Sequence, residues 1–163
     1  MRLPVRAMCF LTAALSLCLG GCSDKTNARV ETKLNQDAAL VGDLPSNPLQ
    51  GRVITSWIDK KSSTMSTLYG NDAAVDYARA NAAKMYPAGS VLSIVTWSQQ
   101  EDPRWFGAKI PQKVRSVEFV AVTGPGVYTY QRYEGSPLKK VEDGAAPNDR
   151  AAYVLSQRAA VMP

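Results

Sequence analysis

The chain has 163 residues, with 19 basic and 14 acidic side chains and a formal net charge of +5. Two of the basic residues, Arg2 and Arg6, lie at the N-terminus, and without them the net charge is +3. This mild charge gives no basic stripe and argues against a nucleic-acid partner. The sequence has no histidine, which excludes a Ser-His-Asp triad, a Cys-His dyad and histidine-ligated zinc or haem.

Residues 1–21 have the composition of a secretory signal peptide. Two arginines are followed by a largely apolar stretch, residues 7–19, and by Leu-Gly-Gly-Cys at positions 19–22. The apolar stretch is too short to span a membrane, which takes about 20 residues. Because a cysteine directly after Leu-Gly-Gly is typical of bacterial lipoproteins, we expect cleavage between Gly21 and Cys22 and lipidation of Cys22. The alternative is an ordinary signal peptide with an incidental cysteine.

The lipidated cysteine predicts where the protein is located. Two or more acyl chains hold a protein stably on a membrane, so we expect a bacterial membrane protein that is anchored by lipid on Cys22. The next residue is Ser23 rather than aspartate, which favours the outer membrane, facing the periplasm. The other cysteines, Cys9 and Cys18, lie in the signal segment, so the mature domain is expected to have no disulfide and no free thiol.

Composition divides the remaining chain into two parts. Residues 22–48 are polar and poor in large apolar side chains, which predicts a lipidated, flexible tether. A helical turn over residues 35–41 is an alternative for part of it. Residues 49–163 are enough for one independently folded domain.

Hydrophobic patterning predicts five strands and two helices in this domain. The first helix begins after its N-cap, Asn71, and ends before Pro87; the second covers residues 150–161. Loops are predicted over residues 101–113 and 135–147. Because the connections are short, we expect an α+β fold in which an antiparallel sheet of about five strands carries the helices on one face. The strands are expected at residues 51–58, 64–69, 90–99, 114–123 and 127–134.

Three segments of the domain share their order and spacing with a known family. They are Val53-Ile54-Thr55-Ser56-Trp57 followed by Leu68-Tyr69-Gly70-Asn71-Asp72-Ala73-Ala74, then Tyr86-Pro87-Ala88-Gly89-Ser90-Val91-Leu92 leading to Trp97, and then Val114 with Val117-Glu118-Phe119-Val120. Across residues 49–133 these segments resemble the domain of cytochrome P-460 and its relatives. The resemblance implies a cytochrome P-460-like fold, a periplasmic setting and, as in many relatives, a homodimer.

Haem-bearing relatives oxidise hydroxylamine-like compounds and hold haem through a Cys-x-x-Cys-His motif near the C-terminus and a lysine crosslink. At that place this chain has Ala146-Pro147-Asn148-Asp149-Arg150-Ala151-Ala152. No thioether and no histidine ligand can form there, so no family catalytic residue is carried over and no cofactor or metal site is expected. Haem bound without covalent bonds is the alternative, with Met65, Met85 or Met162 as conceivable ligands, although core packing also explains these methionines.

Two further places are candidate sites. Trp105 and Phe106 stand beside Arg104 and Lys109 in the predicted loop 101–113, where they form the lip of a ligand or partner site or pack back on the sheet. Glu118 lies within an apolar strand, which predicts either a buried acid with a shifted pKa or a carboxylate that is solvated or paired with a lysine or arginine. Trp57 and Trp97 are expected in the core.

The sequence thus favours a haem-free, non-catalytic domain that serves as a binding or interaction module at the bacterial envelope. A carrier or sensor of a small apolar ligand, or of haem, is one alternative. A degenerate oxidoreductase relative is another, and a cofactor-free hydrolase or isomerase that uses carboxylates is a third. Enzymatic activity is not expected.

Overall fold

The computed structural model describes residues 25–80, 85–142 and 147–160. The predicted signal peptide and Cys22 lie outside these residues. Residues 34–163 form one compact unit, and the residues up to Lys33 belong to another. A helix, α1 (Lys25–Asp37), forms where the sequence predicts a flexible tether. The segment is rich in residues of good helix propensity, such as Ala28, Arg29 and Glu31, which accounts for a helix within the predicted tether.

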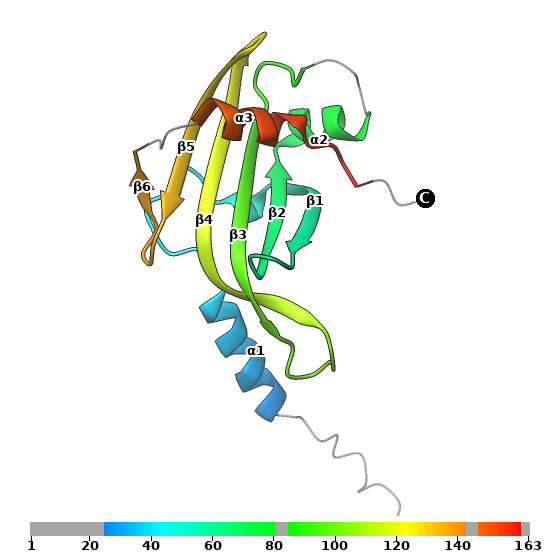
Figure 1. The fold of residues 1–163 in the computed structure, drawn as a ribbon, viewed down its shortest axis with the longest axis vertical. Coiled ribbons are helices and arrows are strands. Elements are labelled where there is room, and N and C mark those ends of the chain that lie inside the picture. The colour runs from blue at the N-terminus through cyan, green and yellow to red at the C-terminus, as the bar shows by residue number, and fades with distance from the viewer. Residues whose placement is uncertain (1–24, 81–84, 143–146, 161–163) are drawn as a thin grey trace, which may run out of the picture. The chain divides into compact units, whose positions relative to one another are not determined.

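A six-stranded antiparallel sheet forms the centre of the compact unit (Figure 1). The strand order follows the chain order, so that each strand pairs with its neighbour in sequence. The α+β class and the antiparallel sheet are confirmed. A sixth strand lies in the predicted loop 135–147, and it was missed because three residues are too few to show a periodic pattern. The strands are β1 (Arg52–Asp59), β2 (Thr64–Gly70), β3 (Val91–Glu101), β4 (Lys109–Gly124), β5 (Val127–Glu134) and β6 (Lys139–Val141).

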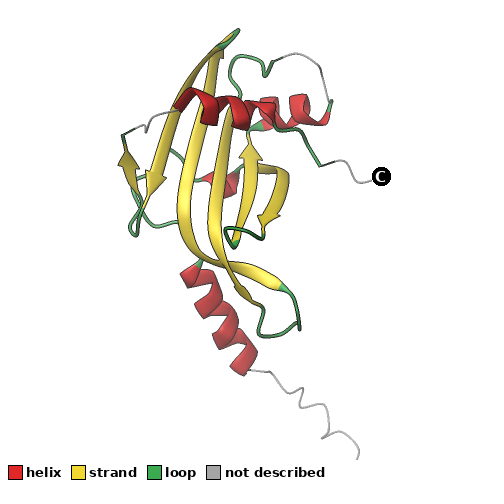
Figure 2. Ribbon diagram, viewed as in Figure 1, coloured by secondary structure: helices red, strands yellow, loops and turns green. Residues whose placement is uncertain are grey.

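Two helices, α2 (Asp72–Arg79) and α3 (Pro147–Ser156), cover one face of this sheet (Figure 2). Val75 of α2 and Val154 of α3 pack with residues of four strands in one buried cluster. Alternate residues of β3 and β4 point into this cluster and into a second one on the opposite face. Burial on both faces explains why these two strands are apolar almost throughout.

The opposite face of the sheet is covered by the segment before β1. Ala38, Leu40 and Leu44 pack against the second cluster, and the indole Nε1 of Trp97 donates a hydrogen bond of 2.9 Å to the carbonyl of Ala38. A short 3-10 helix, η1 (Pro48–Gln50), leads into β1. The compact unit therefore begins before residue 49, the predicted boundary, because these scattered apolar residues complete the core.

The structure also explains two of the sequence segments that carry the family resemblance. At Gly70 a Cβ atom would lie 2.8 Å from the Cδ1 atom of Ile54 and 2.9 Å from the Cβ atom of Ala74, so only glycine fits. The side chain of Asn71 accepts hydrogen bonds from the amides of Ala74 and Val91, both 3.1 Å long. It also donates one of 2.8 Å to the carbonyl of Gly89. Asn71 thus joins the two segments.

β3 and β4 extend beyond the rest of the sheet as a two-stranded arm. β2 pairs with β3 only as far as Ser98, whereas β3 and β4 continue to pair as far as Glu101 and Lys109 (Figure 1). The sequence predicts a loop here because of its prolines and glycine. Pro111 fits because β4 pairs with β5 only from Ser116 onward, so that the missing N–H faces no partner strand.

No helix in the described part of the chain is both long and apolar enough to cross a membrane.

Candidate functional site

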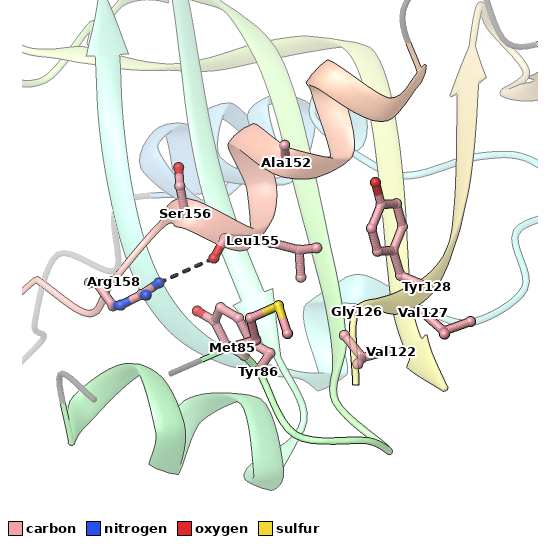
Figure 3. A pocket seen from close by; sticks show the side chains of 10 residues that line it. All are labelled: Met85, Tyr86, Val122, Gly126, Val127, Tyr128, Ala152, Leu155, Ser156 and Arg158. Atoms are coloured by element: carbon pink, nitrogen blue, oxygen red, sulfur yellow. Dashed lines mark hydrogen bonds between the residues drawn. The ribbon is translucent and has the colours of Figure 1, made fainter. Parts of the chain in front are cut away.

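A pocket of about 400 Å³ lies between α3 and the turn that joins β4 to β5. Its volume falls in the range of small-molecule sites. The lining comes from the segment before β3, the β4–β5 hairpin, α3 and the residues that follow α3 (Figure 3). The lining residues are Met85, Tyr86, Val122, Gly126, Val127, Tyr128, Ala152, Leu155, Ser156 and Arg158.

Arg158 is the one charged side chain among the described residues that line the pocket. Its Nη1 atom donates to the carbonyls of Leu155 and Gln157, at 3.1 and 2.9 Å. Its guanidinium lies over the rings of Tyr77 and Tyr86, 5.4 and 5.7 Å from their centroids. These contacts hold a cation at the edge of an apolar cavity.

Tyr86 forms the part of the pocket wall that lies beside Arg158. Its hydroxyl donates a hydrogen bond of 2.9 Å to the carbonyl of Gln157, and the residue is only 3% exposed. Burial raises the pKa of Tyr86, and the positive charge of Arg158 opposes this rise. The phenol therefore stays neutral near neutral pH and acts as a hydrogen-bonding wall rather than as a base.

The polar side-chain groups among the described lining residues are the hydroxyls of Tyr86, Tyr128 and Ser156 and the guanidinium of Arg158. No carboxylate, thiol or imidazole, which are the usual general bases and nucleophiles, occurs among these described residues. The hydroxyl of Ser156 lies 2.7 Å from the carbonyl of Tyr153, to which it donates. No cluster of three or more metal-binding side chains occurs in the described residues.

Glu118 lies outside this pocket and is 2% exposed. Its two carboxylate oxygens accept from the Nε and Nη2 atoms of Arg150, at 2.7 and 2.9 Å. The hydroxyl of Tyr130 donates a third hydrogen bond, 2.7 Å long. Glu118 was expected to be either buried or paired with a basic residue. In the structure it is both buried and paired with an arginine. Three strong donors make it a structural anion that ties α3 to β4 and β5.

The partners of Glu118 have shifted pKa values. Its hydrogen bonds raise the pKa of Arg150 and outweigh the effect of burial. Burial raises the pKa of Tyr130, and the hydrogen bond to the Glu118 carboxylate raises it further. Both partners thus keep their protons over the whole physiological range, as the bidentate geometry requires.

The predicted aromatic lip lies elsewhere, at the tip of the β3–β4 arm. Trp105 is 69% exposed and Phe106 is fully exposed, so the tip does not pack back on the sheet. Neither lines the pocket beside α3. Arg104 forms an ion pair with Asp102, and Lys109 forms one with Glu101. The structure therefore does not bring Arg104, Trp105, Phe106 and Lys109 together with Glu118 or with the pocket.

Two other aromatic residues lie where the sequence predicts them. Trp97 is 6% exposed in the second cluster, and Trp57 packs against the first. The pocket residues, by contrast, were not predicted as a site, apart from Met85, which was considered only as a haem ligand. Arg158 was placed inside a helix that in fact ends at Ser156, and no local signal marks a cavity built from four separate segments.

The fold and the pocket define the class: a small α+β domain in which an antiparallel sheet and a C-terminal helix enclose an apolar pocket. Residues 50–145, more than half of the chain, match the cytochrome P460 family. The chain belongs to the cytochrome P460 family. A search of curated proteins gives no match.

The residues present do not fit the covalent haem of haem-bearing relatives. The chain has no histidine, and its last cysteine is Cys22. Near the C-terminus, where the family resemblance leads us to expect a haem motif, Arg150 of α3 binds Glu118 and Ala151 is completely buried in the core. Core packing and an ion pair therefore already engage these two positions of α3.

Proposed function

We propose that the protein is a lipoprotein of the bacterial envelope whose domain binds a small, largely apolar ligand and catalyses no reaction on it. The main support for this proposal is the pocket beside α3, with its apolar walls and with Arg158 as the one cation among its described lining residues. Lipid on Cys22 would hold the domain on the outer membrane, facing the periplasm. The Leu-Gly-Gly-Cys motif supports that placement.

The lining also indicates the chemistry of the ligand. Apolar walls favour a hydrophobic body, since burial of apolar surface stabilises binding by roughly 25 cal/mol per Å². A guanidinium carries five N–H donors, and within the described residues Arg158 uses Nη1 on two carbonyls. Its remaining donors suit an oxygen of the ligand. The favoured ligand is thus a small amphipathic molecule with a carboxylate or another acceptor group at one end.

The proposal can be tested with an apolar anionic dye, 1-anilinonaphthalene-8-sulfonate, as the probe. We expect saturable binding to the mature chain and a loss of affinity of about tenfold or more in Ala152→Trp, because the indole would fill the pocket from α3. Binding is measured by fluorescence titration. The matched control is Ala73→Trp on the exposed side of α2, outside the pocket, and it should bind the dye as the parent does.

Two outcomes would contradict the proposal. One is equal dye binding by the parent and Ala152→Trp when both show the same near-ultraviolet circular dichroism. The other is a Soret absorption band that survives washing of the purified protein. That band would favour a carrier of non-covalent haem, the alternative that the sequence leaves open.

A further inference from the structure

The arm formed by β3 and β4 ends in a tip that exposes two adjacent aromatic side chains. Trp105 is 69% exposed, and Phe106 has the highest exposure among the large hydrophobic residues that the structure describes. The shaft of the arm carries polar residues, among them Gln100 and Gln112, and its two strands pair up to Glu101 and Lys109. Apolar surface is therefore concentrated at the end of a polar finger.

Several hydrogen bonds close the turn at the tip. The amide of Asp102 donates to the carbonyl of Ala108 at 2.9 Å, and the amide of Ala108 donates to the carbonyl of Trp105 at 3.0 Å. The carboxylate of Asp102 accepts from the amide of Arg104 at 2.8 Å. Gly107 has a φ of 77°, which favours glycine. A fixed turn presents the two rings at a small entropic cost.

Charge distinguishes the arm from an ordinary exposed loop. Residues 98–115 contain four basic and two acidic side chains. Both acids form ion pairs with basic neighbours, Asp102 with Arg104 and Glu101 with Lys109. Lys113 and Arg115, both exposed, leave the arm with a net positive charge. Aromatic rings beside basic side chains are the combination enriched at membrane–water interfaces.

We infer that the tip of the β3–β4 arm inserts shallowly into the surface of an anionic phospholipid bilayer. Trp105 and Phe106 enter the interfacial region, while the basic residues of the arm lie at the level of the headgroups. The polar shaft limits the depth of insertion. This contact would orient the domain on the membrane, which the predicted lipid on Cys22 alone does not do, because an acyl anchor fixes only one end of the chain.

The inference relies on the proposed function only for the presence of a membrane, and its test removes the acyl anchor. The mature chain, residues 22–163 with Cys22→Ala, is mixed with vesicles of phosphatidylcholine and phosphatidylglycerol and sedimented. We expect it to bind, and we expect Trp105→Ala/Phe106→Ala to lower its partition coefficient by about tenfold or more. Binding should also weaken as salt is raised, because the headgroup attraction is screened.

The matched control removes exposed apolar side chains elsewhere. Val53 and Ile58 of β1 are 51% and 50% exposed, and Val53→Ser/Ile58→Ser should bind vesicles as the parent does. Tryptophan emission should shift to the blue when vesicles are added to the parent but not to Trp105→Phe. This second readout reports the position of the Trp105 ring itself.

Three results would overturn the inference. The first is vesicle binding by Trp105→Ala/Phe106→Ala that equals binding by the parent, and the second is no binding by either. The third is self-association of the parent that the tip substitutions abolish while vesicle binding stays unchanged, since the tip would then contact a second copy. Dye titration of Trp105→Ala/Phe106→Ala shows whether the pocket still binds its probe. This measurement distinguishes failure of the membrane contact from failure of the proposed ligand site.

Discussion

Glu118 shows how much a single buried carboxylate can organise. It accepts two hydrogen bonds from Arg150 of α3 and one from Tyr130 of β5. A buried charge with an ideal bidentate partner stabilises a fold less than its geometry suggests, but removing one partner leaves the other uncompensated. We therefore expect that the main effect of the cluster is to hold α3 on the sheet. Because α3 forms one wall of the pocket, the cluster also positions that wall.

Replacement of Glu118 by glutamine tests this role. We expect Glu118→Gln to lower the free energy of unfolding by about 1–3 kcal/mol, because Arg150 loses its counter-ion at a site that is only partly open to solvent. Urea denaturation followed by circular dichroism measures the change. As a control, Glu134→Gln removes the exposed pair with Arg132 and should cost less than about 1 kcal/mol. Equal losses of unfolding free energy in both variants would show that Glu118 stabilises the fold no more than an exposed ion pair does.

Tyr130 makes the cluster sensitive to alkaline pH. Its folded-state pKa is raised above the ordinary value of 10.0, first by burial and then by Glu118. The folded state therefore holds this proton more tightly than the unfolded state. The stabilisation is fully present below about pH 10 and is lost as the pH rises further.

We expect the free energy of unfolding to decline above about pH 10 and the decline to be shallower in Tyr130→Phe. The difference should be below about 1.4 kcal/mol per pH unit, the limit for one group, because solvent screens the half-buried ring. Urea denaturation at a series of pH values gives both slopes. Parallel curves for the parent and Tyr130→Phe would show that other groups cause the decline, for example Tyr69 and Tyr86, whose pKa values burial also raises.

The sequence alone does not predict which side chains pair in this way. The apolar neighbours of Glu118 indicate a buried position, but nothing near it in sequence identifies Arg150, 32 residues away, as its partner. Arg158 shows the same limit. Its place at the pocket depends on where α3 ends, and helix ends are set by tertiary contacts as well as by local propensity.

At the level of elements, Asn71 is the clearest link between sequence and structure. It caps α2 and also holds the start of β3 through Val91 and Gly89. The polar N-cap was predicted from the sequence, whereas the contacts with the segment before β3, about 20 residues away, were not. In this chain the two segments depend on one another through the side chain of Asn71.

We expect Asn71→Ala to lower the free energy of unfolding by about 1–2 kcal/mol, since the helix cap and the link to β3 are lost together. Asn71→Asp should cost less, because it keeps the accepting oxygen but loses the donor to Gly89. Urea denaturation compares both with Asn47→Ala, which removes the cap of the short helix η1. A loss in Asn71→Ala no larger than in Asn47→Ala would contradict the linking role.

The long elements were predicted better than the short ones. β3 and β4 are apolar on both faces, which marks central strands, and α2 has the N-cap that the sequence predicts, Asn71. The last helix was expected to begin after Asn148 or Asp149, but α3 begins at Pro147. β6 and the arm were predicted as loops, because β6 has three residues and the arm contains Pro103 and Pro111. Both depend on pairing with a neighbouring strand, a contact that no local pattern records.

At the scale of the whole molecule, we predict that the protein is lipidated on Cys22. In a bacterial host, we expect the N-terminal peptide of the mature protein to begin at Cys22 and to carry acyl groups, because Leu-Gly-Gly-Cys fits a lipoprotein signal. Mass spectrometry of the membrane fraction measures both properties. Cys18→Ala, which changes the residue directly before Leu19-Gly20-Gly21-Cys22, should leave processing unchanged, whereas Cys22→Ala should abolish acylation. An unmodified Cys22 in the parent would refute the anchor.

The strand order of the sheet bears on how the domain reaches its native state. Every strand of the sheet pairs with a strand adjacent in the chain, so no strand of the sheet has to wait for a partner that lies further along the sequence than its neighbour. Residues 23–163 contain no cysteine, so their folding needs no thiol oxidation. A chain that emerges N-terminus first can therefore add its strands in order of appearance, and α3 completes the core last through Ala151 and Val154.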